Sequence, residues 1–386
     1  MRLEEFHVSE KFGFMLPDPR HTLPDYFEPW NHLAANLLIL IQEKNVRTQV
    51  HQMPLLDPAK LEGYRQKRLA HLQLTVISTG YIWQDGEKGM PDTLPKCLAV
   101  PWYTISEDIG IVPVVCHPDM VLCNWKLADP QKPASLENLR CIYNLPGGMD
   151  ANWFFMIPAR MELDFAPAIK CIVDSIEATD NNDTETLITN LQTIRQVITQ
   201  MKNTFKNIHG LISPDIFYNT FRPFLRGFGG EGSPHPEGII FEGISDKPIQ
   251  MTGGSAAQSS TLQCLDAAFS VKPEPKIQNF LVKMRDHMPK VHKEFIETIA
   301  EKSNIRNYVM KSEDEKLKEI FNDVLLAMVD FRSYHIQIVA KYILIPSSRQ
   351  KRDNLLSKRG TGGTNMLPFL KSIRKATSDK LVEEEH

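Results

Sequence analysis

The 386-residue chain lacks the features that mark several large classes of protein. Its net charge of -3 leaves no excess positive charge with which to neutralise nucleic-acid phosphates. Its longest apolar runs, such as residues 34–41, are far shorter than the roughly 18 to 20 residues that span a bilayer. The first residues are acidic where a secretory signal would be apolar. We therefore expect a cytoplasmic protein that binds neither nucleic acid nor a membrane.

Cysteine is also scarce, and its spacing argues against two kinds of site. No two of the six cysteines form a C-x-x-C pair, and they are scattered over the chain as Cys97, Cys116, Cys123, Cys141, Cys171 and Cys264. The sequence therefore predicts neither a disulfide framework nor a thiolate metal site. We expect reduced, mostly buried thiols.

Proline divides the chain into two regions. Fourteen of the 26 prolines precede Gly147, and proline removes a hydrogen bond from a helix interior. We expect residues 1–146 to form a small domain of mixed short helices and turns, with its best helices at 34–43 and 64–82. Residues 147–386 are expected to form a larger domain with long helices in its proline-free stretches, 168–213 and 290–345.

Apolar residues at three- and four-residue spacing predict two long amphipathic helices in the second region. The first follows Asp183, a suitable N-cap, and its apolar face comprises Leu187, Leu191, Ile194, Ile198, Met201 and Phe205. The second spans 321–342 and is expected to end at Pro346. Residues 227–238 and the basic segment 347–358 are expected to be irregular connections.

His335 interrupts the apolar stripe of the second helix and should therefore face the interior. A buried imidazole needs a hydrogen-bond partner or a metal ion. The residues alone favour an ordinary hydrogen bond over iron ligation. Because one histidine supplies a single coordination bond, a metal held there would need a porphyrin or other ligands, and heme fits this requirement best.

Other motifs have ordinary explanations. The G-x-G-x-x-G at 227–232 is followed by Ser-Pro-His-Pro rather than a helix, which excludes a dinucleotide site. The H-x-[DE] spacings at 117–119 and 235–237 suit a non-heme iron site but are more typical of surface turns. The small residues at 253–260 precede a helix and indicate either close approach of a ligand or a capping turn. Arg222, among aromatic residues, needs a carboxylate from the protein or from a substrate.

Residues 331–343 resemble the proximal-histidine helix of the indoleamine 2,3-dioxygenases, which are heme enzymes that open the pyrrole ring of tryptophan. Residues 253–260 are similar to the family's G-G-S-A-x-Q-S-S loop over the heme, and 360–364 to its G-T-G-G-T lid. Weaker similarity, including residues 65–70 and 124–126, extends over nearly the whole chain.

The resemblance implies a mainly α fold in which a small N-terminal domain caps a large, helical heme-binding domain. It implies heme b (iron protoporphyrin IX) as cofactor, His335 as the proximal iron ligand and no catalytic group beyond the iron. It implies O2 and L-tryptophan or a related indoleamine as substrates and a monomer or weak homodimer. The implied cofactor-binding residues are Ser255, Ala256, Asp266, Arg332 and Phe154, and the implied substrate-binding residues are Phe217, Tyr218, Arg222, Leu225 and Thr361.

Two positions depart from the vertebrate members of the family. His117 stands where those enzymes have a tyrosine, and Pro158 where they have a small hydroxyl residue. Some molluscs use members of the family as myoglobins, and residues 64–74 and 217–230 look closer to those proteins. Tryptophan cleavage to N-formylkynurenine is therefore the favoured function, because the lid and Arg222 are retained, and storage of O2 is the alternative.

Overall fold

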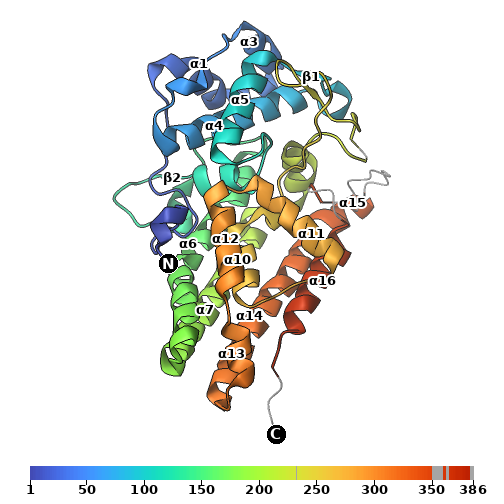
Figure 1. Cartoon of the computed structure of the whole chain (residues 1–386). Coiled ribbons are helices and arrows are strands. Elements are labelled where there is room, and N and C mark those ends of the chain that lie inside the picture. The colour runs from blue at the N-terminus through green and yellow to red at the C-terminus, as the bar shows by residue number, and fades with distance from the viewer. Residues whose placement is uncertain (232, 350–359, 362–364, 383–386) are drawn as a thin grey trace.

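The computed structural model describes residues 1–231, 233–349, 360–361 and 365–382. Helices dominate these residues, and the strands among them are two residues long (Figure 1). β1 (Thr93–Leu94) pairs in parallel with β4 (Ile240–Phe241), and β2 (Lys126–Leu127) pairs antiparallel with β3 (Leu139–Arg140). The expected mainly α class is therefore confirmed.

The helices between residues 28 and 109 form the upper layer in Figure 1. The α-helices of this layer are α1 (Glu28–Ala35), α2 (Leu37–Gln42), α3 (Val46–Gln52), α4 (Gly63–Trp83) and α5 (Lys96–Ile109). α4 matches the predicted helix at 64–82. It is buried along most of its length and contacts the other four helices of this layer. The continuous helix predicted at 34–43 is wrong, because Asn36 separates α1 from α2. Its side chain donates to the carbonyl oxygen of His32 at 2.9 Å and competes with the helical backbone.

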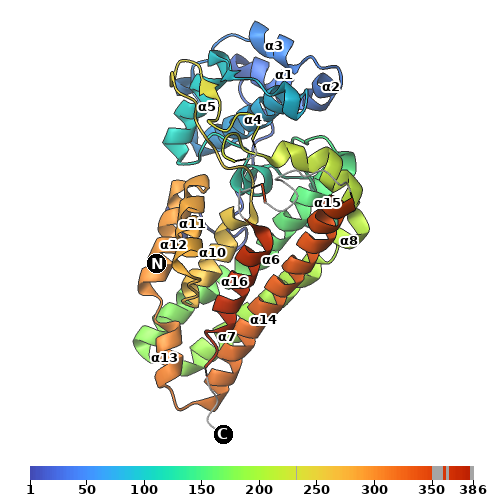
Figure 2. The same ribbon diagram turned by 90° about the vertical axis from the view of Figure 1, so that its right-hand side faces the viewer.

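Long helices form the lower layer, where α6, α7, α14 and α16 run side by side (Figures 1 and 2). The α-helices after residue 147 are α6 (Gly148–Asn181), α7 (Thr184–Phe205), α8 (Ile208–Leu211), α9 (Pro214–Ile216), α10 (Ser260–Ala268), α11 (Pro275–Met284), α12 (Lys290–Lys302), α13 (Ile305–Lys311), α14 (Glu315–Val339), α15 (Ile345–Arg349) and α16 (Met366–Ser378). α7 matches the first predicted amphipathic helix, and the Asp183 carboxylate caps it by accepting from the Thr186 amide at 3.1 Å.

Short helical turns, labelled η, connect these helices. They are η1 (Leu3–Phe6), η2 (Asp25–Phe27), η3 (Pro58–Lys60), η4 (Glu87–Gly89), η5 (Pro118–Cys123), η6 (Leu136–Asn138), η7 (Phe217–Phe221), η8 (Arg222–Leu225), η9 (Ala256–Gln258), η10 (Arg285–His287) and η11 (Ala340–Leu344). Residues 227–238, which were predicted to be irregular, contain no helix in their described part, and a single bridge there joins Phe228 to Met251. No helix follows the G-x-G-x-x-G motif there.

Proline does not end helices where the sequence suggested. α6 runs through both Pro158 and Pro167. At the end of α14 the chain continues through η11 into α15, which contains Pro346 and Ser347. The expected end at Pro346 is therefore wrong, because a proline in the first turn of a helix needs no amide hydrogen bond. The predicted connection at 347–358 begins inside α15, and residues 350–358 lie outside the described residues.

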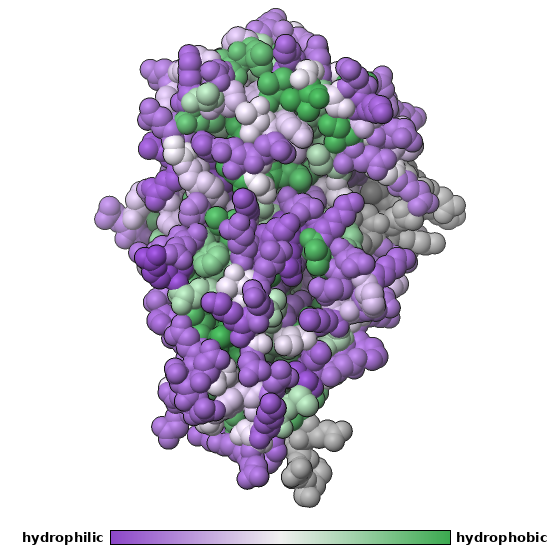
Figure 3. All heavy atoms as spheres, viewed as in Figure 1, coloured by the Kyte–Doolittle hydropathy of each residue, from purple (hydrophilic) through white to green (hydrophobic). Residues whose placement is uncertain are grey.

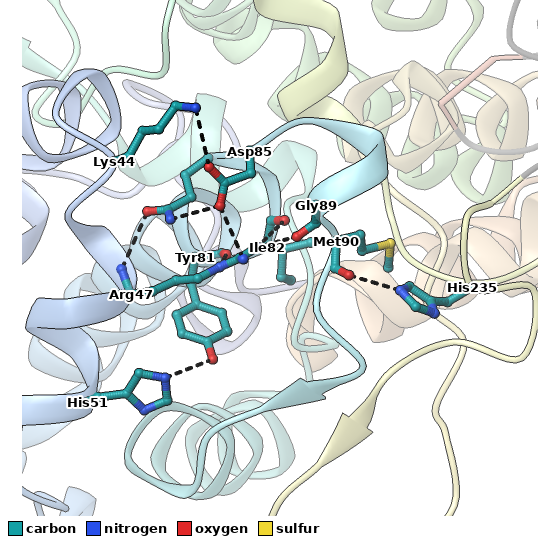
Figure 4. A network of polar contacts seen from close by, with 10 residues as sticks. Lys44, Arg47, His51, Tyr81, Ile82, Asp85, Gly89, Met90 and His235 are labelled. Atoms are coloured by element: carbon teal, nitrogen blue, oxygen red, sulfur yellow. Dashed lines mark hydrogen bonds and ion pairs between the residues drawn. The ribbon is translucent and has the colours of Figure 1, made fainter.

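Several contacts connect the two regions of the chain. The first residues pack on the lower helices, since the Met1 amino group lies 3.2 Å from Glu177 and the Phe6 ring contacts Phe295. The segment that contains β4 reaches back to the upper layer, where His235 lies 3.0 Å from the carbonyl oxygen of Met90 (Figure 4). The domain boundary at 146/147 stays a prediction.

Arg47 on α3 stabilises the corner of the upper layer that receives this segment (Figure 4). Its guanidinium donates to the carbonyl oxygens of Tyr81 at 3.0 Å and Ile82 at 3.4 Å, at the end of α4. It also pairs with the Asp85 carboxylate at 3.1 Å. A single side chain thereby satisfies carbonyl groups that the helix end leaves open.

Most of the thiols are buried, as the sequence predicted, and the surface is mixed in polarity. Hydrophobic residues on the face shown in Figure 3 form separate patches among hydrophilic ones. All six cysteines are free, and four of them are buried. None of the helices in the described ranges is both long and apolar enough to cross a membrane.

Candidate functional site

A cavity of about 320 Å³ lies between the two layers. Its walls come from η5, α6, the η7–η8 turns, the segment 253–263, α14 and α16, and most of the lining side chains are apolar. The charged or titratable side chains in the lining are Cys116, His117, Glu162, Arg222, Asp266, Arg332, His335 and Tyr342. The volume is in the range of sites for small organic ligands.

His335 projects from α14 into this cavity. Its ring contacts Phe205, and among the described residues no group forms a hydrogen bond with it. Burial, assisted by the positive charge of Arg332, lowers the pKa of His335 to about 4. The imidazole is therefore neutral at physiological pH, which is the form that ligates iron. A buried, neutral imidazole without a protein partner fits a heme ligand, so the hydrogen-bonded alternative is not what the structure shows.

Arg332 lies one helical turn before His335, so both side chains share one face of α14. Its guanidinium donates to the Asp266 carboxylate, to the Thr377 hydroxyl, and to the carbonyl oxygen of Ile373 at 3.1 Å. Burial raises the pKa of Asp266, and the charge of Arg332 opposes that shift. The pair places polar groups beside an otherwise apolar part of the cavity.

The loop before α10 is held by Gln258, which is fully buried. Its Oε1 accepts from the backbone amides of Ser255 at 3.2 Å and His117 at 3.1 Å, and its Nε2 donates to Gly253 at 2.8 Å. Ser255 caps the turn that follows. Because Ser255 and Ala256 are small and line the cavity, they leave room for a flat ligand.

Aromatic side chains line the opposite part of the cavity. The rings of Phe154 on α6 and Phe217 on η7 stack with centroids 5.0 Å apart. Arg222 and Leu225 also line the cavity, and both are buried. Burial lowers the pKa of Arg222 to about 10, so the guanidinium stays charged at neutral pH. Tyr218 is not among the lining residues, but its ring lies against the Arg222 guanidinium. The guanidinium carbon is 5.5 Å from the centroid of the Tyr218 ring.

The described part of the lid also reaches the cavity. Thr361 lines it, and its hydroxyl donates to the carbonyl oxygen of Gly254. Gly360 lies beside it. The remaining residues of the G-T-G-G-T segment, 362–364, lie outside the described residues.

The prediction of a surface turn at His117 is wrong. It is not part of a surface turn, since its side chain lines the cavity and its Nε2 lies 3.2 Å from Glu162. Asp119, the other end of that motif, is fully buried and accepts from Thr75 at 2.8 Å while pairing with His71 at 2.7 Å. Among the described residues, no group of three such side chains has the arrangement of a metal site.

Glu162 is a cavity residue that sequence reasoning missed. It follows Phe155 and Ala159 on the buried face of α6, so it interrupts an apolar stripe as His335 does. This break in the apolar stripe could have identified Glu162 from the sequence. It was not recognised because Pro158 and Pro167 argued against one continuous helix through this segment.

The chain is similar to known proteins over nearly its whole length. The model of a family described as indoleamine 2,3-dioxygenase matches residues 2–380. A protein named myoglobin from Haliotis madaka is 39% identical over 378 residues, covering 98% of each chain. Indoleamine 2,3-dioxygenase 2 from Mus musculus is 36% identical over 389 residues, covering 99% of this chain and 96% of that protein. An indoleamine 2,3-dioxygenase from Aspergillus nanangensis is 30% identical over 400 residues, covering 97% of this chain and 96% of that protein.

Proposed function

Because the chain belongs to the indoleamine 2,3-dioxygenase family, we propose that it is a heme-dependent dioxygenase that opens the pyrrole ring of L-tryptophan with O2 to give N-formylkynurenine. Membership of this family implies that the chain binds heme. The observation that carries the proposal is one cavity that joins an unpartnered, neutral imidazole, His335, to a buried cation, Arg222, past aromatic walls. Heme b as the form of the cofactor, a cytoplasmic location and a monomer or weak homodimer belong to the same proposal.

His335 is the group assigned to hold the heme iron. Bound heme would supply the site at which O2 reacts with the indole ring. Ser255, Ala256 and Phe154 would pack against the macrocycle, because all three line the cavity. The Arg332–Asp266 pair would lie near its polar edge and keep α14 in register with α16 through the Thr377 contact.

Arg222 is the group assigned to bind the substrate carboxylate. A guanidinium offers paired donors that match a carboxylate, and its burial strengthens the attraction. Phe217 and Leu225 would contact the indole ring, Tyr218 would orient the guanidinium by lying against it, and Thr361 would close over the amino-acid backbone. The side chains therefore contribute placement and exclusion of water, and the iron remains the reactive group.

Steady-state kinetics of the reduced holoprotein with L-tryptophan in air test this function. The wild-type protein should form N-formylkynurenine, and Arg222→Ala should raise KM by about tenfold or more, because a charge-assisted hydrogen bond is lost. Arg195 on α7 forms an exposed ion pair with Asp323 on α14, and Arg195→Ala is the matched control, which should leave KM unchanged. An unchanged KM in Arg222→Ala would contradict the assignment of the carboxylate partner.

Storage of O2 is the second candidate function. The similarity to the Haliotis proteins named myoglobin, over almost the full length of both chains, favours it. An oxygen store should form a long-lived oxygenated complex whose absorption spectrum and decay do not respond to tryptophan. Rapid loss of that complex when tryptophan is added would exclude storage as the main function.

A further inference from the structure

His117 and Glu162 place a polar pair in an apolar wall of the cavity. His117 lies directly before η5, Glu162 lies on α6, and both line the cavity. Their side chains are only 12% and 5% exposed, so the pair has little contact with the outer solvent. Neither group has a role in the function proposed above.

The partners of Glu162 decide which nitrogen of His117 carries the hydrogen. Glu162 Oε1 accepts from the Ser259 hydroxyl at 3.3 Å, and Oε2 accepts from the Thr261 hydroxyl at 2.5 Å. Surrounded by donors, the carboxylate acts as an acceptor for His117 as well, so Nε2 of the imidazole donates to it. In the neutral ring, Nδ1 then has a free lone pair.

This Nδ1 atom has no hydrogen-bond partner in the part of the chain that the structure describes. The backbone amide of His117 donates to Gln258, which fixes the position of the residue. Two other polar side chains of the cavity already have partners. The Gln263 side chain forms hydrogen bonds with two backbone carbonyl oxygens and with an arginine. The Tyr342 hydroxyl donates to backbone carbonyl oxygens at 2.8 and 3.2 Å. His117 Nδ1 is therefore an acceptor available to a ligand.

The neighbouring wall supplies no comparable acceptor. The lining residues near His117 in the chain are Val115, Cys116, Met120 and Val121, and all are apolar apart from the weakly polar Cys116 thiol. Pro158 lines the cavity too, and its ring carries neither donor nor acceptor. An indole N–H that enters such a wall gives up its hydrogen bond to water and is penalised unless the protein replaces it.

We propose that His117 is a specificity-determining residue, whose Nδ1 accepts a hydrogen bond from the indole N–H of the substrate, with Glu162 as the positioning residue that fixes its tautomer. The inference rests on the proposed function, because it concerns the same ligand. It extends that function by naming the group that distinguishes an indole from a ring of the same shape without an N–H.

Equilibrium binding tests the proposal without turnover. The ferric holoprotein is titrated with L-tryptophan and with the analogue in which sulfur replaces the ring N–H, β-(benzothiophen-3-yl)-L-alanine, and the heme absorption spectrum reports occupancy. The wild-type protein should bind tryptophan about tenfold more tightly than the analogue. His117→Phe should bring this ratio close to one, while His117→Gln, which keeps an acceptor oxygen, should retain part of it.

Thr261→Val separates the acceptor from a merely structural role. It removes the donor to Oε2 of Glu162, but Ser259 still donates to Oε1 and the His117 contact stays in place, so the carboxylate still accepts from Nε2 and the ratio should be unchanged. If His117→Phe does not retain heme, His117→Met offers a side chain without a ring nitrogen for the same comparison.

The outcomes distinguish this inference from the function beneath it. A wild-type protein that binds tryptophan without preferring it over the analogue, or a full preference in His117→Phe, overturns the role of His117 alone. A wild-type protein that binds neither compound overturns the tryptophan site, and this inference with it.

Discussion

At the scale of single residues, the cavity depends first on His335. Replacing it by alanine removes the imidazole that faces the cavity and should abolish stable heme binding, since no other described side chain takes its place on that face of α14. The absorbance of the heme relative to that of the protein, measured after gel filtration, reports the loss. His32→Ala, at an exposed histidine of α1, is the control and should bind heme normally. Full heme content in His335→Ala would remove the assignment.

A second histidine, His292, makes stability depend on pH. It is buried on α12 against Phe14, and Nδ1 has no hydrogen-bond partner. Burial, together with the charges of Arg68 and His7, lowers the pKa of His292 from 6.5 to about 3. Below pH 6.5, His292 therefore binds a proton in the unfolded chain, but in the folded chain it stays neutral until about pH 3. The contribution to stability is complete above pH 6.5 and is lost as the pH falls through this window.

The variant His292→Gln, which cannot be charged, measures this contribution. The free energy of unfolding from urea titrations between pH 6 and pH 4 should fall less steeply than in the wild-type protein, by up to about 1.4 kcal/mol per pH unit. His32→Gln is the matched control, because that ring is exposed. Equal slopes in His292→Gln and the wild-type protein would show that His292 is charged in the folded state.

Individual residues also show what a sequence pattern can predict. The inward-facing position of His335 could be predicted because it interrupts a clear apolar stripe on a helix free of proline, whereas its role as iron ligand stays a prediction. Glu162 has the same pattern, but Pro158 and Pro167 obscured the helix on which it lies. His292 had no signal, since its partners Phe14 and Arg68 lie more than two hundred residues away in the chain.

At the scale of elements, the loop from Gly253 to Gln258 begins at a very close backbone contact with the segment that follows η8. A β-carbon on Gly253 would collide with the Gly227 amide nitrogen and the Leu225 carbonyl oxygen. These are backbone atoms of the η8 connection, which cannot turn aside as a side chain would. The close approach of the two segments therefore requires glycine at 253.

Gly253→Ala should separate these two segments and weaken both tryptophan binding and thermal stability. The loop carries Ser255 and Ala256, and the η8 turn carries Arg222 and Leu225, so a displacement affects two walls of the cavity at once. Gly210→Ala is the matched control, because nothing lies within 4 Å of a β-carbon there. Differential scanning calorimetry and the tryptophan titration measure both effects. A Gly253→Ala protein with the melting temperature and affinity of the wild-type protein would contradict this account.

Helix boundaries mark the limit of sequence reasoning at this scale. Asp183 and the apolar period after it determined α7, because the cap and the buried face are both local. Proline was a weaker guide, since its effect depends on its place in the helix. Pro346 lies in the first turn of α15, and packing of α6 against α7 maintains a 34-residue helix despite two internal prolines.

At the scale of the whole molecule, the sequence could predict the fold class but not how the cavity is assembled. Its walls come from segments between residues 115 and 373, which meet only through tertiary packing. The pairing of strands between distant parts of the chain could not be predicted from the sequence either. β4 pairs with β1 across almost 150 residues, and β-strands of two residues leave no period in a sequence.

Removal of the heme tests how far the cavity depends on its ligand. A ligand that binds only the folded state stabilises it by an amount set by its affinity and concentration, so the heme-free protein should melt at a lower temperature. The loss of stability on removal of heme should be confined to the cavity walls. Segments that line the cavity, such as η5 and the loop 253–258, should exchange their amide hydrogens faster, whereas α3 and the end of α4, which Arg47 holds together, should not change.

Hydrogen exchange followed by mass spectrometry, on holoprotein and heme-free protein at the same pH and temperature, measures this distribution. Restoring heme should return both the exchange pattern and the melting temperature, because the cavity walls are built from side chains already in place. Uniformly faster exchange in both layers would show instead that heme is needed for the whole fold, and identical patterns would show that the cavity is rigid without it. Faster exchange confined to the cavity walls would mean that the two layers fold first and the cofactor orders the site between them.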